Sequence, residues 1–195
     1  MKRLVDILFS IGILGLFFPL GCFLSLAILF ESKGGIFYRQ ERIGKDGKAF
    51  FLLKFRSMRP LADQSGKLTI GTKDPRITRV GTFIRKYKLD EFPQFINVLK
   101  GEMSLVGPRP EVSEYVELYS QEQQKVLGYK PGITDVASLA YFEENRLLAE
   151  SQDPHRTYVE EIMPEKLRLN LDYQQKANVL TDIGVIIRTA LRILK

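Results

Sequence analysis

The chain of 195 residues contains one cysteine, one histidine and no tryptophan. A single cysteine, Cys22, excludes an intrachain disulfide and a cysteine-rich metal site, and its apolar neighbours predict a small buried side chain. With His155 as the only histidine, a histidine metal cluster and a Ser-His-Asp triad have little support. Because tryptophan is absent, any anchoring at a membrane interface must come from Tyr, Phe, Lys and Arg.

Positive charge is concentrated in the middle of the chain. The net charge is +6, and residues 31–110 alone carry 17 Lys or Arg against 8 Asp or Glu. Residues 1–30 have a net charge of +1, whereas residues 111–195 have −4. A basic middle of this kind can meet nucleic acid, anionic lipid or a phosphorylated small molecule. The length suits one domain with a modest core.

An uncharged run of 24 residues, 7–30, precedes the basic region. At ~1.5 Å per residue, a continuous helix of this length could cross the ~30 Å hydrocarbon core of a bilayer. Pro19 interrupts the run, because proline removes a helix hydrogen bond and disfavours helical angles at Phe18. Positive residues flank both ends, which favours a cytoplasmic location for both. We therefore expect residues 1–32 to form a re-entrant membrane helix and residues 33–195 to form a cytosolic domain at the membrane surface.

Two alternatives stay open for this apolar segment. One is a kinked transmembrane helix, since helices in a bilayer tolerate proline. The other is a signal peptide, which the length of the run and the lack of a small-x-small cleavage site disfavour.

The whole chain predicts an α+β fold that is mostly helical, with a short β-hairpin, the re-entrant helix and amphipathic surface helices. The hairpin comprises 36–43 and 49–58, joined by a turn at 45–48. We expect a polar loop at 61–73, a turn at 130–134, and helices from Thr78 or Thr82 to about Leu89 and over 93–99, 111–127, 143–150, 158–175 (interrupted or started at Pro164) and 179–195. The last helix is amphipathic, and either lies in a membrane interface or covers the core.

Asp90 and Glu91 are adjacent carboxylates at a proline break inside the most basic stretch. They could hold a metal ion, or one could attack an electrophile that the cations hold; a phosphate group fits both roles. If they lie at the entrance of a helix that begins at Pro93, its dipole favours their charged forms. Consecutive helical side chains point about 100° apart, so the two are expected to act differently. From these residues alone, helix capping is favoured over catalysis.

Several blocks along the chain resemble the bacterial sugar transferase family, and within it the small monotopic phosphoglycosyl transferases. The blocks are 37–44, 54–58, 74–81, 89–94, 97–104, 106–110 and 130–132, which read FYRQERIG, KFRSM, DPRITRVG, LDEFPQ, NVLKGEMS, VGPRP and KPG. Their order and spacing make the match specific, and with the apolar segment the resemblance covers nearly the whole chain.

This resemblance implies transfer of a sugar-1-phosphate from a UDP-sugar to polyprenyl (undecaprenyl) phosphate at the cytoplasmic face of the bacterial inner membrane. UMP is released, and the lipid-linked sugar starts a glycan. The resemblance makes Asp90 the nucleophile of a covalent phosphosugar intermediate, and it implies that Glu91 assists proton handling or the magnesium site. Both residues are candidate Mg²⁺ ligands. The proline that breaks the family's re-entrant helix matches Pro19, but the family often has Ser before it, where this chain has Phe18.

A diphosphate donor repels a carboxylate nucleophile until Mg²⁺ and basic side chains neutralise its charge. The best candidates for phosphate contacts are Arg85 and Arg109, followed by Lys54 and Arg56. The expected partners are the UDP-sugar, polyprenyl phosphate and the lipid bilayer, without nucleic acid; a homodimer stays open. The alternative is a non-catalytic basic module that binds a membrane surface or nucleic acid, although no base-stacking platform is evident.

Overall fold

The computed structural model describes residues 1–60 and 74–194, so the expected loop at 61–73 and Lys195 lie outside the described residues. Helices predominate and two small sheets accompany them, which confirms the α+β class. The helices are α1 (Lys2–Leu16), α2 (Phe18–Glu31), α3 (Arg79–Lys86), α4 (Gln94–Lys100), α5 (Ser113–Val116), α6 (Gln121–Gln124), α7 (Val136–Ala140), α8 (Glu144–Glu150), α9 (Pro154–Thr157), α10 (Met163–Gln174) and α11 (Val179–Ile193). The strands are β1 (Phe37–Ile43), β2 (Ala49–Phe55), β3 (Ser104–Val106) and β4 (Gly132–Thr134).

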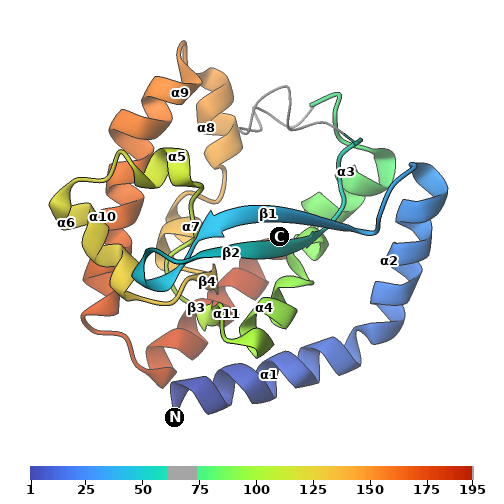
Figure 1. The fold of residues 1–195 in the computed structure, drawn as a ribbon, viewed down its shortest axis with the longest axis horizontal. Coiled ribbons are helices and arrows are strands. Elements are labelled where there is room, and N and C mark those ends of the chain that lie inside the picture. Colours follow the sequence, from blue (N-terminus) through green and yellow to red (C-terminus); the bar gives the residue numbers. More distant parts are fainter. Residues whose placement is uncertain (61–73, 195) are drawn as a thin grey trace.

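The β1–β2 hairpin crosses the middle of the molecule (Figure 1). In the same view α1 runs beneath it, α2 rises along one side, and α8, α9 and α10 form the opposite side. The antiparallel hairpin and the interruption ahead of α10 at Pro164 confirm the expectations for these segments.

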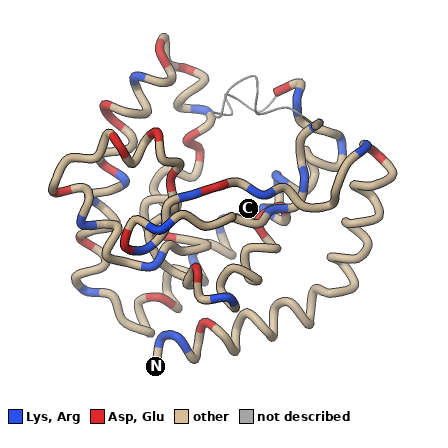
Figure 2. The backbone as a smooth tube through the Cα atoms, viewed as in Figure 1, with Lys and Arg blue, Asp and Glu red and all other residues tan. Residues whose placement is uncertain are grey.

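The apolar amino-terminal segment is broken where the sequence predicts. The break is at Phe17, and Pro19 lies in the first turn of α2, where its missing N–H removes no helix hydrogen bond. The two helices are bent by 62°. Within the described residues no single helix is long and apolar enough to cross a bilayer, whereas the bent pair α1–α2 together meets that length and composition. Figure 2 shows uncharged residues along most of both helices.

Helix α1 is attached to the fold through its few polar side chains. The buried carboxylate of Asp6 accepts a hydrogen bond from Ser104 Oγ at 2.9 Å. Arg3 donates to two main-chain carbonyls at the end of α4, at 2.6 and 3.0 Å, where a cation complements the helix dipole. Because these contacts use one side of α1, the apolar side chains on its other side stay exposed.

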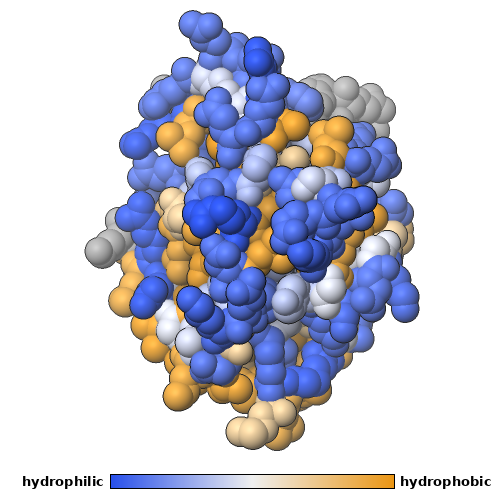
Figure 3. All heavy atoms as spheres, turned by 90° about the vertical axis from the view of Figure 1, so that its left-hand side faces the viewer, coloured by the Kyte–Doolittle hydropathy of each residue, from blue (hydrophilic) through white to orange (hydrophobic). Residues whose placement is uncertain are grey.

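Exposed apolar side chains extend from α1 over α2 and α11. They include Leu4, Leu8, Ile11, Leu16, Phe18, Phe23, Leu26, Phe30, Leu180, Ile187, Leu191 and Leu194. Figure 3 shows hydrophobic atoms along the lower edge and one flank of the molecule. The apolar stripe of α11 therefore does not cover the core, which α11 contacts through Val185 instead.

The prediction that Cys22 is buried is wrong. Cys22 is exposed on α2, whereas Leu24 and Ile28 of the same helix are buried against Phe55 and Ile84. Successive helical residues are rotated by about 100°, which turns Cys22 away from that contact.

Two predictions for the middle of the chain are also wrong. The helix expected over 111–127 is divided into α5, α6 and a 3₁₀ turn, η4 (Lys125–Gly128). A new helix starts at Ser120, because its hydroxyl accepts from the Gln123 N–H while the Gln123 side chain accepts from the Ser120 N–H. The turn expected at 130–134 contains strand β4, which pairs in parallel with β3.

The pairing of β3 with β4 depends on two glycines. A Cβ atom at Gly107 would clash with the carbonyl oxygen of Lys130, and one at Gly132 would clash with the backbone nitrogen of Gly107. Only glycine allows two backbones to approach this closely. The stretch 106–110, which carries Arg109, is thereby held against the stretch 130–132.

We expect Gly132→Ala to lower the free energy of unfolding by about 1–3 kcal/mol, because the added methyl group has no space. The measurement is thermal unfolding in detergent. Gly128→Ala is the matched control, since nothing lies within 4 Å of its Cβ position. Equal melting temperatures for the two variants would contradict the close approach of the two segments.

Candidate active site

Asp90 and Glu91 lie on a short turn of their own between two helices. Helix α3 is capped by Thr78, as expected, but it ends at Lys86 because Lys88 adopts left-handed angles (φ 55°, ψ 19°). The 3₁₀ turn η3 (Leu89–Glu91) follows, and Pro93 is the N-cap of α4 rather than part of its first turn. The left-handed residue thus separates η3, which carries the acidic pair, from α3.

Both carboxylates line a cavity of about 950 Å³. This volume lies within the range of about 300–1,000 Å³ that is usual for small-molecule sites. The lining also includes the four cations expected to contact phosphate, which are Arg85, Arg109, Lys54 and Arg56. The structure therefore brings together all six proposed catalytic and phosphate-binding residues, from α3, η3, the end of β2 and the segments that follow β2 and β3.

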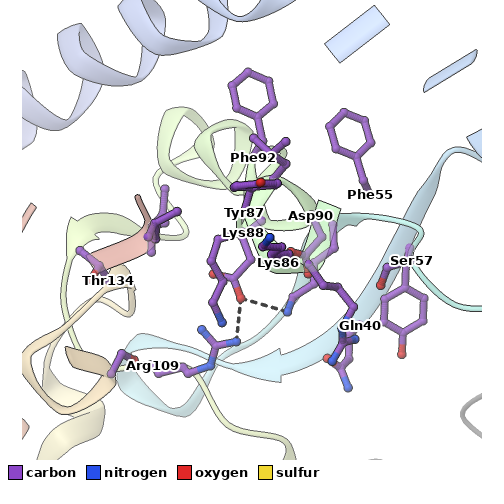
Figure 4. A pocket seen from close by; sticks show the side chains of 18 of the residues that line it. Gln40, Phe55, Ser57, Lys86, Tyr87, Lys88, Asp90, Phe92, Arg109 and Thr134 are labelled. Atoms are coloured by element: carbon purple, nitrogen blue, oxygen red, sulfur yellow. Dashed lines mark hydrogen bonds and ion pairs between the residues drawn. The ribbon is translucent and has the colours of Figure 1, made fainter. Parts of the chain in front are cut away.

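Glu91 is held by two cations. Arg109 Nη2 donates to Glu91 Oε1 at 2.9 Å, and Lys54 Nζ donates to the same oxygen at 3.3 Å (dashed lines in Figure 4). Burial opposes ionisation of this carboxyl, but the attraction of Arg109 and Lys54 outweighs it and holds the pKa of Glu91 far below its usual range. In return, Glu91 raises the pKa of Arg109. Glu91 is therefore a fixed, charged carboxylate.

Asp90 has the opposite character. It is 6% exposed, and its Oδ1 has no hydrogen-bond partner within the described residues. Burial raises the pKa of Asp90 above the ordinary 3.8, against the effect of Lys54, and Glu91 raises it further. The expectation that the charged form is favoured is wrong for Asp90, because Asp90 lies on η3 ahead of α4 and the effect of burial dominates its pKa. Two adjacent carboxyls whose pKa values are shifted apart can take different chemical roles.

The four cations differ in what they contact. Lys54 and Arg109 bind Glu91, whereas Arg56 Nη2 donates to the Ser32 carbonyl at 2.7 Å and to Ser32 Oγ at 3.0 Å. The guanidinium of Arg56 thus secures the connection between α2 and β1. Arg85 is partly exposed and, within the described residues, makes no hydrogen bond or ion pair. It is the cation best placed to receive an anionic ligand.

Lys54 is positioned by a side chain that the sequence analysis did not single out. The fully buried amide of Asn97, on α4, accepts from the Leu53 N–H at 3.0 Å and donates to the Phe51 carbonyl at 2.8 Å. It therefore satisfies main-chain groups of β2 that have no partner in β1. This contact fixes the end of β2 against α4, and Lys54 with it.

A second polar cluster on the cavity wall was also missed. Glu111 accepts from the Tyr158 hydroxyl at 2.6 Å and pairs with Arg42 Nη1 at 3.2 Å. All three side chains line the cavity. The sequence could have indicated these residues by their positions, because Glu111 directly follows the stretch 106–110 and Arg42 lies within the stretch 37–44.

The donor set around the acidic pair was tested for a metal ion. Among residues 1–60 and 74–194, no group of three or more His, Cys, Asp or Glu is arranged to hold one. Mg²⁺, however, is commonly bound through one or two carboxylates together with substrate phosphates. The unpartnered Oδ1 of Asp90, with Glu91 beside it, fits that smaller requirement.

Comparison with known proteins places the chain in a family. The family model described as bacterial sugar transferase matches residues 1–195. The chain belongs to the bacterial sugar transferase family. The resemblance drawn from the sequence blocks is thereby confirmed.

Three curated relatives illustrate the similarity. A protein of Bacillus subtilis (strain 168), provisionally named an undecaprenyl-phosphate N-acetylgalactosaminyl 1-phosphate transferase, is 45% identical over 122 residues, which cover 63% of this chain and 68% of the relative. The UDP-glucose:undecaprenyl-phosphate glucose-1-phosphate transferase of Escherichia coli (strain K12) is 37% identical over 198 residues, 98% of this chain and 40% of the relative. The UDP-N-acetylgalactosamine-undecaprenyl-phosphate N-acetylgalactosaminephosphotransferase of Aeromonas hydrophila is 44% identical over 122 residues, 63% of this chain and 29% of the relative. The chain thus spans less than half the length of the last two.

The opposite pKa shifts of the pair predict opposite effects on stability. A carboxyl with a raised pKa in the folded state destabilises the fold above that pKa, and the penalty disappears as the pH falls to the unfolded value. We therefore expect Asp90→Asn to raise the melting temperature at pH 7.5, by about 2–4 °C per kcal/mol gained, with a smaller gain toward pH 4. Glu91, whose lowered pKa stabilises the fold above pH 4.5, supplies the matched variant. Glu91→Gln should lower the melting temperature at pH 7.5; a fall in both variants would contradict the split.

Proposed function

We propose that the chain is a phosphoglycosyl transferase that moves a sugar-1-phosphate from a UDP-sugar to undecaprenyl phosphate and releases UMP. The observation that carries this proposal is the split acidic pair, in which a buried Asp90 with a free oxygen lies beside a Glu91 fixed by Lys54 and Arg109. The family match and the names of the curated relatives support the class of reaction.

The transfer proceeds in two displacements at one phosphorus atom. The Asp90 carboxylate attacks the β-phosphorus of the donor, and the bond from that phosphorus to the bridging oxygen breaks, so that UMP leaves with the bridging oxygen and its electron pair. A phosphate oxygen of the acceptor then attacks the same phosphorus and displaces Asp90. The product is a polyprenyl-diphosphate sugar, and the carboxylate is restored.

The cations make this attack feasible by offsetting negative charge on the donor. Arg85 lines the cavity without an ion pair of its own among the described residues, so it can bind a donor phosphate. Arg109 uses one of its five N–H groups on Glu91 and keeps others for phosphate. Arg56 is already bound to Ser32, so its proposed role shifts from phosphate contact to holding the hairpin.

Mg²⁺ is proposed as the cofactor, with Asp90 and Glu91 as its protein ligands. When bound it would neutralise charge on the donor diphosphate. Glu91 has a second carboxylate oxygen outside its ion pairs, since both cations bind Oε1.

We further propose that α1 and α2 form a re-entrant membrane helix and that the rest of the chain lies on the cytoplasmic face of the bacterial inner membrane. The exposed apolar faces of α1, α2 and α11 support this placement. The cavity also has an apolar wall, to which Phe9 and Ile13 of α1 and Ile186 and Ile193 of α11 contribute. This wall joins the apolar surface to the acidic pair and suits an acceptor with a long hydrocarbon chain. A non-catalytic basic module gives no reason for buried carboxylates inside a cavity.

The reaction is tested by UMP release from a panel of UDP-sugars with undecaprenyl phosphate and Mg²⁺. With the best donor, we expect Asp90→Asn to lose at least about 10³-fold in rate while it still binds membranes. A donor labelled with phosphorus-32 in the β-phosphate should label the wild-type chain at Asp90 in quenched turnover. Asp172→Asn, a change at an exposed carboxylate, is the control and should keep full activity. Normal turnover of the Asp90 variant would refute the nucleophile.

Re-entry is tested by cysteine labelling in a Cys22→Ser background. One cysteine is placed in a short tag ahead of Met1, and another replaces Lys48 in the exposed turn of the hairpin. Because re-entry puts both ends on the cytoplasmic side, neither cysteine should react with an impermeant reagent added to intact cells, and both should react after permeabilisation. Labelling of the tag from outside would show instead that the segment spans the membrane.

A further inference from the structure

A π-helical turn interrupts the long carboxy-terminal helical region at the cavity. This turn, η5 (Tyr158–Ile162), lies between α9 and α10. Such turns are rare and occur frequently at functional sites, because they change the direction of a side chain at some cost in helix regularity. Here the first residue of the turn, Tyr158, donates its hydroxyl to Glu111 at 2.6 Å.

Glu111 joins Tyr158 to a buried cation. Arg42 Nη1 lies 3.2 Å from Glu111 Oε2, and the two side chains are only 15% and 12% exposed. A buried ion pair is weak support for stability, because desolvation of both charges offsets their attraction. The pair lines the cavity beside the apolar cluster that contains Tyr115 and Tyr158, so a ligand in the cavity can reach it.

The cluster of Arg42, Glu111 and Tyr158 lines the same cavity as the acidic pair. Arg109 binds Glu91 and lies two residues before Glu111 in the chain. The same cavity is therefore lined by two groups of paired charges, Glu91 with its two cations and Glu111 with Arg42. A donor whose phosphates lie beside Glu91 and its cations would place another of its groups near Glu111 and Arg42.

The side chains of Glu111, Arg42 and Tyr158 are chemically suited to bind hydroxyl groups. The carboxylate of Glu111 accepts hydrogen bonds, whereas Arg42 only donates them. Burial, and then Glu111, raises the pKa of Tyr158 far above its usual range, so its hydroxyl stays protonated. Tyr115, whose ring contacts that of Tyr158 with centroids 4.9 Å apart, adds an aromatic wall. Adjacent hydrogen-bond donors and acceptors beside aromatic rings can bind two vicinal hydroxyl groups.

We propose that Arg42, Glu111 and Tyr158 bind vicinal hydroxyls of the nucleotide-sugar donor and set its specificity. The inference rests on the proposed function for the identity of the donor. Vicinal hydroxyls are present on the sugar and on the ribose, and the experiment below distinguishes them. A site built to hydrogen-bond a hydroxyl rejects an analogue that lacks it, because its buried polar groups are then left unpaired.

The test compares the preferred UDP-sugar with analogues that lack one hydroxyl, either on the sugar or at the 2′ position of the ribose. Two quantities are measured for each: kcat/KM for UMP release, and the dissociation constant from calorimetry. We expect the wild-type chain to disfavour one analogue by about 10-fold or more, and Glu111→Gln and Tyr158→Phe to reduce this ratio to about 2–3-fold. Loss of discrimination on the sugar identifies the sugar, and loss at the 2′ position identifies the ribose.

Tyr119→Phe is the matched control. Tyr119 is a buried tyrosine near Glu111, but its hydroxyl makes no hydrogen bond within the described residues and it is not among the residues that line the main cavity. The control should keep the wild-type ratio. If Glu111→Gln fails to fold, Tyr158→Phe decides. Activity that falls equally for all donors, with unchanged ratios, would overturn the inference and leave a structural role.

The two measurements separate this inference from the proposed function. If the variants turn over and the ratios between the preferred UDP-sugar and its analogues are unchanged, the inference is refuted and the proposed function stands. If no UMP is released but the variants reduce the ratio of dissociation constants, the transferase proposal is refuted. The hydroxyl-binding site for a nucleotide sugar is then retained. Absence of both binding and turnover sinks both.

Discussion

The interaction on which the site depends is the contact of Glu91 with Arg109 and Lys54. It joins three segments that are distant in sequence: the turn η3, the end of β2 and the segment after β3. Two cations on one oxygen satisfy a buried charge that would otherwise be costly. Lys54 and Arg109 both bind Glu91, whereas Asp90 Oδ1 has no hydrogen-bond partner among the described residues. The two adjacent carboxyls therefore differ in their surroundings.

Much of the surrounding structure serves to hold these three segments in place. Asn97 fixes β2 and therefore Lys54, while Gly107 and Gly132 let the segment that carries Arg109 lie directly against another backbone. The left-handed Lys88 turns the chain so that Asp90 and Glu91 leave the axis of α3. None of these residues has the reactive chemistry of the site, yet each determines where a charged group lies.

Local features could be predicted from the sequence, and non-local ones could not. The cap at Thr78, the helix break next to Pro19 and the hairpin each follow from one or two neighbouring residues. The short strands β3 and β4 have no period to detect, and their pairing depends on contacts between distant segments. The raised pKa of Asp90 was missed for the same reason, because burial is a property of the whole fold and can exceed the effect of a helix end.

The two substrates of the proposed reaction differ in polarity, and so do the walls of the cavity. One wall, with Phe9 and Ile186, continues into the exposed apolar faces of α1 and α11, whereas the other carries Arg109 and Glu111. In Figure 4, Phe55 and Phe92 lie toward the helix at the top and Arg109 lies on the opposite side, with Asp90 between them. A covalent intermediate suits this arrangement: Asp90 can take the phosphosugar from the polar wall and release it to a lipid phosphate from the apolar one. Donor and acceptor then need not occupy the centre together, which avoids bringing their negative charges close at once.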